Sequence, residues 1–222
     1  MVELGVPYSD PIADGPVIAA SYTRALSRGV KLARIFEMVE ALRTGDRVTS
    51  PVVTMVSYSI VHRHGVIPYL DRARASGVDG LIVPDLPVEE AGELCRLATE
   101  RQLKLIQLVT PTTPRDRAMR IVETTTGFLY YVSVAGITGE RKAISPDLAD
   151  NVGWMRSQTD LPVCIGFGIS GPDQIRALAP MADGLIVGSA LVKRLADAGS
   201  KPRDEVVADV GRFVSELAEA LG

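Results

Sequence analysis

The sequence has few of the residues that a disulfide scaffold, a metal centre or a nucleic-acid interface needs. Its 222 residues include two cysteines, Cys95 and Cys164, too few for a disulfide framework, which favours a reducing, cytoplasmic setting. The two histidines, His62 and His64, lie in one polar loop with no visible third ligand, so no metal site is expected. The net charge of −3 gives no basic excess, which argues against nucleic acid as a partner.

Long apolar runs and common nucleotide motifs are also missing. No run reaches the length of a membrane helix, about 18 residues, and the first residues lack the charged-then-apolar pattern of a signal peptide. There is no nucleophile elbow and no Walker loop. The segment G-F-G-I-S (166–170) lacks the third glycine and the ribose carboxylate of a dinucleotide fingerprint. We therefore expect neither a membrane protein nor a dinucleotide enzyme.

The chain instead alternates between short apolar runs and amphipathic stretches. The apolar runs are rich in Val, Ile and Leu with little polar alternation, which predicts strands buried on both faces of a parallel sheet. These predicted strands are Met1–Leu4, Val52–Val56, Gly80–Val83, Leu103–Val109, Phe128–Val132, Val163–Gly166 and Gly184–Val187. Apolar spacing and N-terminal prolines predict helices between or after them. The helices are Lys31–Leu42, Val88–Gln102, Pro114–Thr124 and Pro202–Leu221.

Regular strand–helix alternation predicts βαβ units in an α/β fold. An open doubly wound sheet and a closed eightfold barrel both fit this pattern. A TIM (β/α)8 barrel usually has about 250 residues, and seven strands are visible here. The expected fold is thus such a barrel lacking its first strand and helix. With no low-complexity linker or composition shift, residues 1–222 are expected to form a single barrel domain, incomplete at its N-terminus.

The segment with the most polar chemistry is E-L-G-V-P-Y-S-D-P-I-A-D-G-P, residues 3–16. Glu3 lies at a strand end, and the following loop carries Asp10 and Asp14. In a barrel the active site forms at the C-terminal strand ends, where two carboxylates can supply acid/base chemistry and charge stabilisation. Asp10 and Asp14 equally suit turn formation, because Asp before Pro or Gly favours turns. A carboxylate between Val2 and Leu4 in a buried strand is costly unless it faces a cavity, which favours a functional role for Glu3.

Glycine-rich turns follow three late strands, at residues 135–139, 166–170 and 187–190. Glycines let backbone amides approach an anion closely, and a following helix adds N-terminal donors. Loops after the last two strands are the usual phosphate site of this barrel class. Ordinary βα turn chemistry explains any one of these turns alone. The three turns together, each at a strand end, indicate a phosphate site.

Several of these segments resemble signatures of one known family. The segment 3–16 is similar to the signature of the tryptophan synthase alpha subunit family. Further segments match in order along the chain: P-D-L-P-V-E-E (84–90), T-P-T-T-P (110–114), S-V-A-G-I-T-G (133–139), G-F-G-I-S (166–170) and V-G-S-A (187–190). The first segment is specific to the family, and the later ones are shared in part with other phosphate-binding barrels.

The resemblance implies a lyase of tryptophan biosynthesis that splits indole-3-glycerol phosphate into indole and glyceraldehyde 3-phosphate by a retro-aldol reaction. By position, Glu3 matches the acid/base that protonates indole C3 and helps deprotonate the side-chain hydroxyl. Asp14 matches the carboxylate that holds the indole N–H. The remaining matches are the substrate-binding positions Met55, Ile82, Val109, Tyr130, Thr138, Phe167 and Ile186, and the phosphate-binding positions Gly139, Gly168, Gly188 and Ser189.

The resemblance also implies a partner. Family members act with a tryptophan synthase beta subunit, and an α2β2 heterotetramer is expected. No cofactor is expected in this chain, because the family's pyridoxal phosphate belongs to the beta subunit. Family members also carry a strand and helix before the position of Glu3, which accounts for the expected seven strands.

Two alternatives remain open at this point. Another phosphate-binding barrel enzyme, such as a phosphosugar isomerase, would share the late glycine turns but should lack the loop S-D-P-I-A-D-G-P (9–16). A truncated, poorly active chain would act only as a partner-binding module, because a closed barrel that loses one strand exposes two edges.

Overall fold

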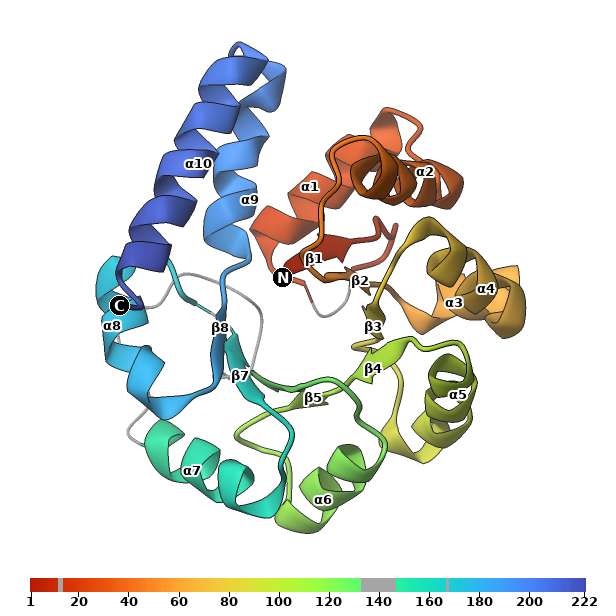
Figure 1. Cartoon of the computed structure of the whole chain (residues 1–222), viewed down its shortest axis with the longest axis vertical. Helices are drawn as coiled ribbons and strands as arrows, with labels where there is room; N and C mark the ends of the chain where they lie inside the picture. Colours follow the sequence, from red (N-terminus) through yellow and green to blue (C-terminus); the bar gives the residue numbers. More distant parts are fainter. Residues whose placement is uncertain (12–13, 133–146, 167) are drawn as a thin grey trace. The chain divides into compact units, whose positions relative to one another are not determined.

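The computed structural model describes residues 1–11, 14–132, 147–166 and 168–222 (Figure 1). The chain divides into two compact units. The first spans Met1–Ile12, Tyr22–Leu108 and Pro114–Leu129, and the second spans Ala13–Ser21, Val109–Thr113 and Tyr130–Gly222. The single domain expected over residues 1–222 stays a prediction.

The first unit contains a four-stranded sheet in the order β1-β2-β3-β4. Each neighbouring pair is parallel, as expected for strands that are separated by helices. The strands are β1 (Val2–Gly5), β2 (Val52–Met55), β3 (Gly80–Ile82) and β4 (Lys104–Ile106). They overlap the runs predicted from sequence, with ends that differ by up to three residues; β1 extends one residue beyond its predicted run, to Gly5.

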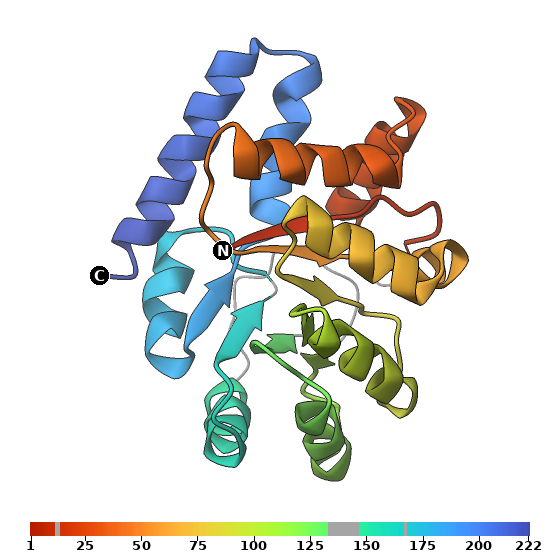
Figure 2. The ribbon, with the colours of Figure 1, turned by 45° about the vertical axis from the view of Figure 1, so that its right-hand side comes forward.

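Helices α2, α4 and α5 lie on the same side of this sheet in both views (Figures 1 and 2). The helices of this unit are α2 (Leu32–Thr44), α3 (Tyr58–His64), α4 (Val66–Ser76), α5 (Val88–Glu100) and α6 (Arg115–Glu123). Helix α1 (Pro16–Ser27) belongs to the second unit up to Ser21 and to the first from Tyr22. The helices predicted over 31–42, 88–102 and 114–124 correspond to α2, α5 and α6.

The two faces of this sheet have different neighbours. Residues that pair across parallel strands point to the same face, and successive residues alternate between faces. Leu81 and Leu105 lie on the face covered by helices, in a core with Phe36 of α2 and Leu70 of α4. Met55 and Ile82 lie in the register row that points to the opposite face. The sheet therefore presents a row of side chains away from its helices.

Strand β1 differs from the sequence-based expectation of a buried strand. Val2 is 51% exposed, Glu3 is exposed and Leu4 is only partly buried. The strand lies at the edge of its sheet, where β2 is its one neighbour among the described strands. The inference that Glu3 sits in a buried strand is thus wrong, because an edge strand has one neighbour instead of two.

The second sheet has the order β5-β6-β7-β8. Its strands are β5 (Leu108–Val109), β6 (Leu129–Val132), β7 (Val163–Gly166) and β8 (Gly184–Ile186). The predicted run Leu103–Val109 forms both β4 and β5, because it is interrupted at Gln107. The buried amide of Gln107 donates to the hydroxyl of Thr124 at the end of α6. A polar side chain with its own partner therefore marks the break.

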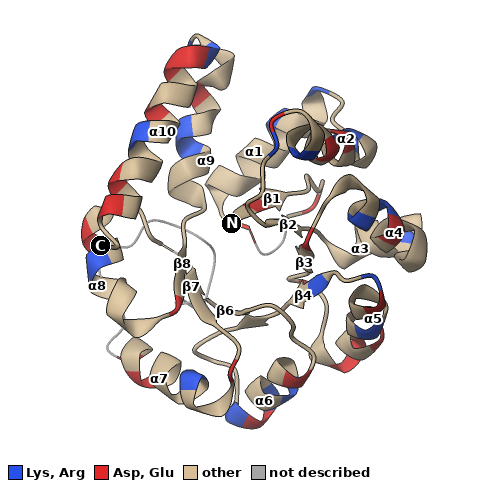
Figure 3. Ribbon diagram, viewed as in Figure 1, with Lys and Arg blue, Asp and Glu red and all other residues tan. Residues whose placement is uncertain are grey.

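The second unit also holds the C-terminal helices. They are α7 (Leu148–Gln158), α8 (Pro172–Leu178), η1 (Ala179–Met181), α9 (Ser189–Leu195), η2 (Ala196–Gly199) and α10 (Arg203–Glu219). Helix α10 buries Val206, Phe213 and Leu217 along one stripe, as its predicted period requires. Acidic and basic residues both occur along α10 (Figure 3). Within the described residues, no helix is long and apolar enough to cross a membrane.

Candidate active site

Glu3 lies on the same face of the first sheet as two predicted wall residues. Glu3 pairs with Val53, and two residues further along the strands Gly5 pairs with Met55. Met55 in turn pairs with Ile82. The alternation along a strand places Glu3, Met55 and Ile82 on the face that points away from α2, α4 and α5. An exposed carboxylate on this face lies beside a largely apolar row, in which Ile82 is fully buried.

Gly5 allows an aromatic ring to approach that row. A Cβ atom at Gly5 would lie 3.1 Å from the Tyr22 hydroxyl and 3.2 Å from Cε1 of its ring. Tyr22 is buried within α1. Glu3 and Gly5 are two residues apart on one strand, so their side-chain positions point to the same face. Sequence reasoning missed Tyr22, because nothing in helical periodicity predicts a ring against a glycine on another element.

Asp14 lies just before helix α1. Pro16 opens the helix, since its fixed φ and missing N–H suit a first helical turn, and the Gly15 carbonyl accepts the N–H of Ala19 at 2.9 Å. The Asp14 side chain is half-buried, and this burial raises the pKa of its carboxyl above the usual value of 3.8. Partial burial of a carboxyl is unusual for a residue that only forms a turn.

The second sheet positions Tyr130 over β7. Tyr130 is 5% exposed, and a Cβ atom at Gly166 would lie 2.5 Å from Cε1 of its ring. Only a glycine at this position leaves room for the ring. Gly166 pairs with Ile186 of β8, so Tyr130 and Ile186 line neighbouring parts of this sheet. Val109 of β5 is buried, and Ile186 is half-buried.

The phosphate-binding positions follow the paired ends of β7 and β8. Gly168 and Gly188 each come two residues after the pair Gly166 and Ile186, so both turns leave the same end of the sheet. Gly168 has a φ of 78°, a left-handed conformation that favours glycine. Gly188 is exposed, and a Cβ atom built on it would meet nothing within 4 Å. Ser189 follows it as the first residue of α9.

Three of the predicted positions, Thr138, Gly139 and Phe167, lie outside the described residues. The remaining ones divide between the two units. Glu3, Met55 and Ile82 belong to the first unit. The second unit contains Asp14, Val109, Tyr130, Gly168, Ile186, Gly188 and Ser189. In the first unit the structure thus places the Glu3 carboxylate beside an apolar row. In the second it places the Tyr130 ring on the sheet from which the Gly168 and Gly188 turns leave.

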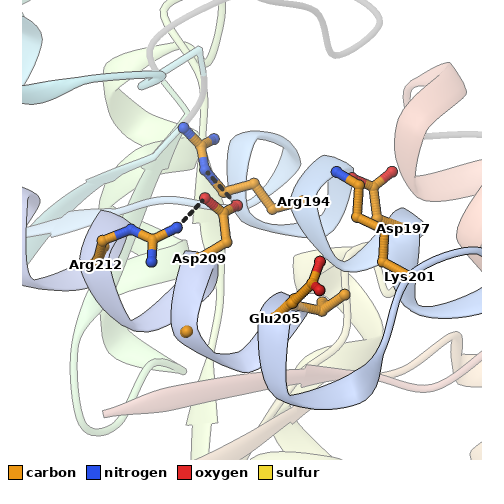
Figure 4. Close-up of a pocket in the computed structure, with 8 residues that line it drawn as sticks. Arg194, Asp197, Lys201, Glu205, Asp209 and Arg212 are labelled. Carbon is orange, nitrogen blue, oxygen red and sulfur yellow. Dashed lines mark hydrogen bonds and ion pairs between the residues drawn. The ribbon is translucent and has the colours of Figure 1, made fainter.

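Two other features carry less chemistry. Among the described residues, no group of three or more His, Cys, Asp or Glu side chains could hold a metal ion. A hollow of about 270 Å³ lies between α9 and α10 (Figure 4). Most of its charges are paired: Asp209 pairs with Arg194 at 3.6 Å and with Arg212 at 3.3 Å, and Asp197 pairs with Lys201 at 2.7 Å.

Comparison with known proteins gives one consistent result. The sequence profile described as "Tryptophan synthase alpha chain" matches residues 1–221. A tryptophan synthase alpha chain of Rhodopirellula baltica is 55% identical, covering all of this chain and 82% of that protein. Another from Caldanaerobacter subterraneus subsp. tengcongensis is 42% identical, with the same coverage of both proteins.

Solved structures agree with these relatives. The tryptophan synthase complex from Pyrococcus furiosus contains a chain that is 38% identical, with a TM-score of 0.88, covering 98% of this chain and 85% of that one. The tryptophan synthase subunit alpha of Legionella pneumophila is 34% identical, with a TM-score of 0.88, covering 99% of this chain and 80% of that one. The predicted fold class, the α/β TIM-barrel type of tryptophan synthase alpha structures, is confirmed.

These matches favour the lyase over the other barrel enzymes that share its late glycine turns. The chain therefore belongs to the tryptophan synthase alpha chain family and is a lyase of tryptophan biosynthesis that cleaves indole-3-glycerol phosphate to indole and glyceraldehyde 3-phosphate.

Proposed function

We propose that Glu3 and Asp14 carry out the chemistry of this cleavage. In its acid form, the Glu3 carboxyl donates a proton to C3 of the indole ring. The protonated ring has a positive charge centred on its nitrogen. It can therefore accept the electrons of the bond between C3 and the glycerol side chain when that bond breaks. Asp14 accepts a hydrogen bond from the indole N–H, and its negative charge stabilises the charge that develops there.

The bond-breaking step follows from that protonated state. The side-chain hydroxyl next to C3 loses its proton to Glu3, which is now a carboxylate, and becomes the aldehyde of glyceraldehyde 3-phosphate. The electrons of the broken carbon–carbon bond return to the ring and restore its aromaticity. One proton enters at C3 and one leaves the hydroxyl, so the step needs no further reactant. One carboxyl group serves as acid and then as base.

Apolar walls and a phosphate cradle position the substrate in this proposal. The proposed binding positions for the indole ring are Met55, Ile82, Val109, Tyr130, Thr138, Phe167 and Ile186. Backbone amides at Gly139, Gly168 and Gly188 and the hydroxyl of Ser189 bind the phosphate. Apolar side chains orient the flat indole ring and form no hydrogen bonds with Glu3 or Asp14, so both carboxyl groups can act on the substrate.

One observation carries this proposal: Glu3 shares a sheet face with Met55 and Ile82, away from the helices, and lies two residues along its strand from their register row. A carboxyl group beside an apolar row can reach a ring carbon of a flat substrate that lies on that row.

Cleavage carried out in deuterated water tests the protonation step. Indole formed by the chain should carry deuterium at C3, in equal amount to the glyceraldehyde 3-phosphate released, with no added cofactor. Indole incubated with the chain alone corrects for slow exchange in solution. Indole that forms without deuterium at C3 would contradict proton donation by a solvent-exchanging carboxyl such as Glu3.

We further propose that the chain binds a tryptophan synthase beta subunit in an α2β2 heterotetramer, with pyridoxal phosphate held by the beta subunit. The support is the likeness to a chain of the Pyrococcus furiosus tryptophan synthase complex. Sedimentation of the chain with and without a purified beta subunit tests this assembly. A chain that sediments at the same rate in both cases does not form it.

A further inference from the structure

Gln174 joins the two sides of the turn that follows β7. Its Oε1 accepts the N–H of Ser170 at 2.7 Å and the Ser170 hydroxyl at 2.9 Å. Its Nε2 donates to the carbonyl oxygen of Gly168 at 3.0 Å. The backbone N–H of Ser170 at the oxygen and the Gly168 carbonyl at the nitrogen define the orientation of the amide, because the flipped side chain would lose both of these bonds.

The sequence explains why a glutamine stands here. Gly171 precedes helix α8 and has no side chain to cap it, and Pro172 supplies no N–H in the first turn. Gln174 occupies the third helical position, from which a Glu or Gln can reach back to a backbone N–H before the helix. Capping alone needs only the acceptor oxygen. The bond from Nε2 to Gly168 is therefore an additional contact, made to a residue six positions earlier.

That additional contact fixes a peptide plane in the turn. In a trans peptide the C=O and the N–H point in opposite directions, and the structure contains no cis bond among the described residues. Because Gln174 holds the Gly168 carbonyl toward α8, the N–H of Ile169 in the same plane points away from α8. Gly168 has a left-handed φ of 78°. Because glycine adopts many backbone conformations, this peptide plane could rotate if the bond to Gln174 were absent.

We propose that Gln174 is a positioning residue for phosphate binding, which it promotes by holding the Gly168–Ile169 peptide of this turn in one orientation. This inference rests on the proposed phosphate-binding role of Gly168. Preorganised amides bind an anion more tightly than mobile ones, because they lose no conformational entropy when the anion binds. A glutamate cannot replace Gln174, because an ionised carboxylate has no donor for the Gly168 carbonyl and places a like charge near the phosphate.

Three variants separate positioning from capping and from charge. Gln174→Met removes all three bonds without adding charge. Gln174→Glu keeps the acceptor that caps the turn and loses the donor. Gln158→Glu serves as the matched control: it makes the same charge change at the exposed end of α7, where the side chain donates to the Ser157 hydroxyl.

The measurement is calorimetric binding of glycerol 3-phosphate and, separately, of indole, together with steady-state cleavage kinetics. We expect Gln174→Met and Gln174→Glu to weaken glycerol 3-phosphate binding by about tenfold, equivalent to about 1.4 kcal/mol. Indole affinity should be unchanged, and KM should rise with little change in kcat, as for lost ground-state binding. Gln158→Glu should behave like the parent chain.

The outcomes distinguish this inference from the function on which it rests. Gln174→Met that binds glycerol 3-phosphate within twofold of the parent chain would overturn the role of Gln174 alone. If Gln174→Met does not fold, Gln174→Glu gives the same decision, because it keeps the capping acceptor. A parent chain that binds indole but no glycerol 3-phosphate would overturn both the phosphate site and the role of Gln174.

Discussion

Asp79 and Asp183 make the same pair of contacts at two separate places in the chain. Each begins a copy of the sequence D-G-L-I-V, at 79–83 and 183–187. The Asp79 carboxylate accepts the N–H of Val52 at 2.7 Å and pairs with Arg43 at 2.5 Å. Arg43 also donates to three backbone carbonyls around it. One carboxylate thus joins the start of β2, the start of β3 and the end of α2.

Asp183 repeats this arrangement in the second unit. Its carboxylate accepts the N–H of Val163 at 2.9 Å and pairs with Arg156 at 2.7 Å. These contacts join the start of β7, the start of β8 and helix α7. In both places the bonds lie at the strand ends opposite the proposed site, where a barrel of this class places stability and not chemistry.

Asn at either position should therefore lower stability and leave turnover intact. Both carboxylates are partly exposed, so solvent screening limits the loss to about 1 kcal/mol for Asp183→Asn. Asp79→Asn should cost at least as much, because it also leaves Arg43, whose side chain is 20% exposed, without its carboxylate. Urea unfolding measures the stability and cleavage kinetics the activity. A variant with parent stability and lost turnover would contradict this assignment.

The stabilisation by Asp183 should also depend on pH. The N–H of Val163 and then the Arg156 guanidinium hold the pKa of this carboxyl below 3.8. A lowered folded pKa gives stability that is present above the unfolded pKa, about 3.9, and is lost as pH falls through the folded value. The stability difference between the parent chain and Asp183→Asn should thus shrink below about pH 4. A difference that stays constant to pH 2 would show that the charge contributes nothing.

The sequence predicts the elements of this fold better than it predicts their surroundings. Strand runs and helix stripes depend on local apolar spacing, so β7 at Val163–Gly166 and α5 from Val88 are confirmed. The exposure of β1 is not local, because it depends on which strands flank it. The split of the run 103–109 depends on Gln107 finding a partner at Thr124, 17 residues away.

The candidate site shows the same limit. Motifs identify Glu3, Asp14 and the glycine turns, because the chemistry needs particular residue types at strand ends. They do not reveal Tyr22 against Gly5 or Tyr130 against Gly166, since these contacts join separate elements. Gln174 has a weak local signal, its position three residues after Gly171, but its bond to Gly168 appears only in the structure.

Because the Tyr130 ring packs directly on Gly166, adding one methyl group at this glycine should disturb both the fold and the site. Gly166→Ala would place a Cβ atom 2.5 Å from Cε1 of the Tyr130 ring, so the ring or the strand must move. We expect a loss of about 1–3 kcal/mol in stability from overpacking and a marked fall in indole affinity. Unfolding and indole titration measure the two effects.

Gly153→Ala is the matched control for this change. Gly153 lies within α7, and a Cβ atom there meets nothing within 4 Å. Alanine should raise stability by up to about 1 kcal/mol through helix propensity and leave activity unchanged. Equal effects of the two substitutions would show that Tyr130 does not depend on the glycine.

Asp14→Asn separates function from stability. Burial raises the folded pKa of Asp14, so the charged form is destabilising, and this cost is absent below the unfolded pKa and grows as pH rises through the folded value. The variant should be at least as stable as the parent at pH 7, an advantage that disappears near pH 4, while turnover falls by about 100-fold or more. A turnover equal to that of the parent would remove Asp14 from the mechanism.

The role of Glu3 is the central claim, and single-turnover cleavage of indole-3-glycerol phosphate by Glu3→Gln tests it most directly. The amide keeps the size of the carboxyl but cannot transfer the proton, and Glu219→Gln at the exposed end of α10 serves as the control. We predict that Glu3→Gln lowers the cleavage rate at least about 100-fold, with unfolding and glycerol 3-phosphate binding unchanged. Cleavage by Glu3→Gln at the rate of Glu219→Gln would contradict the account.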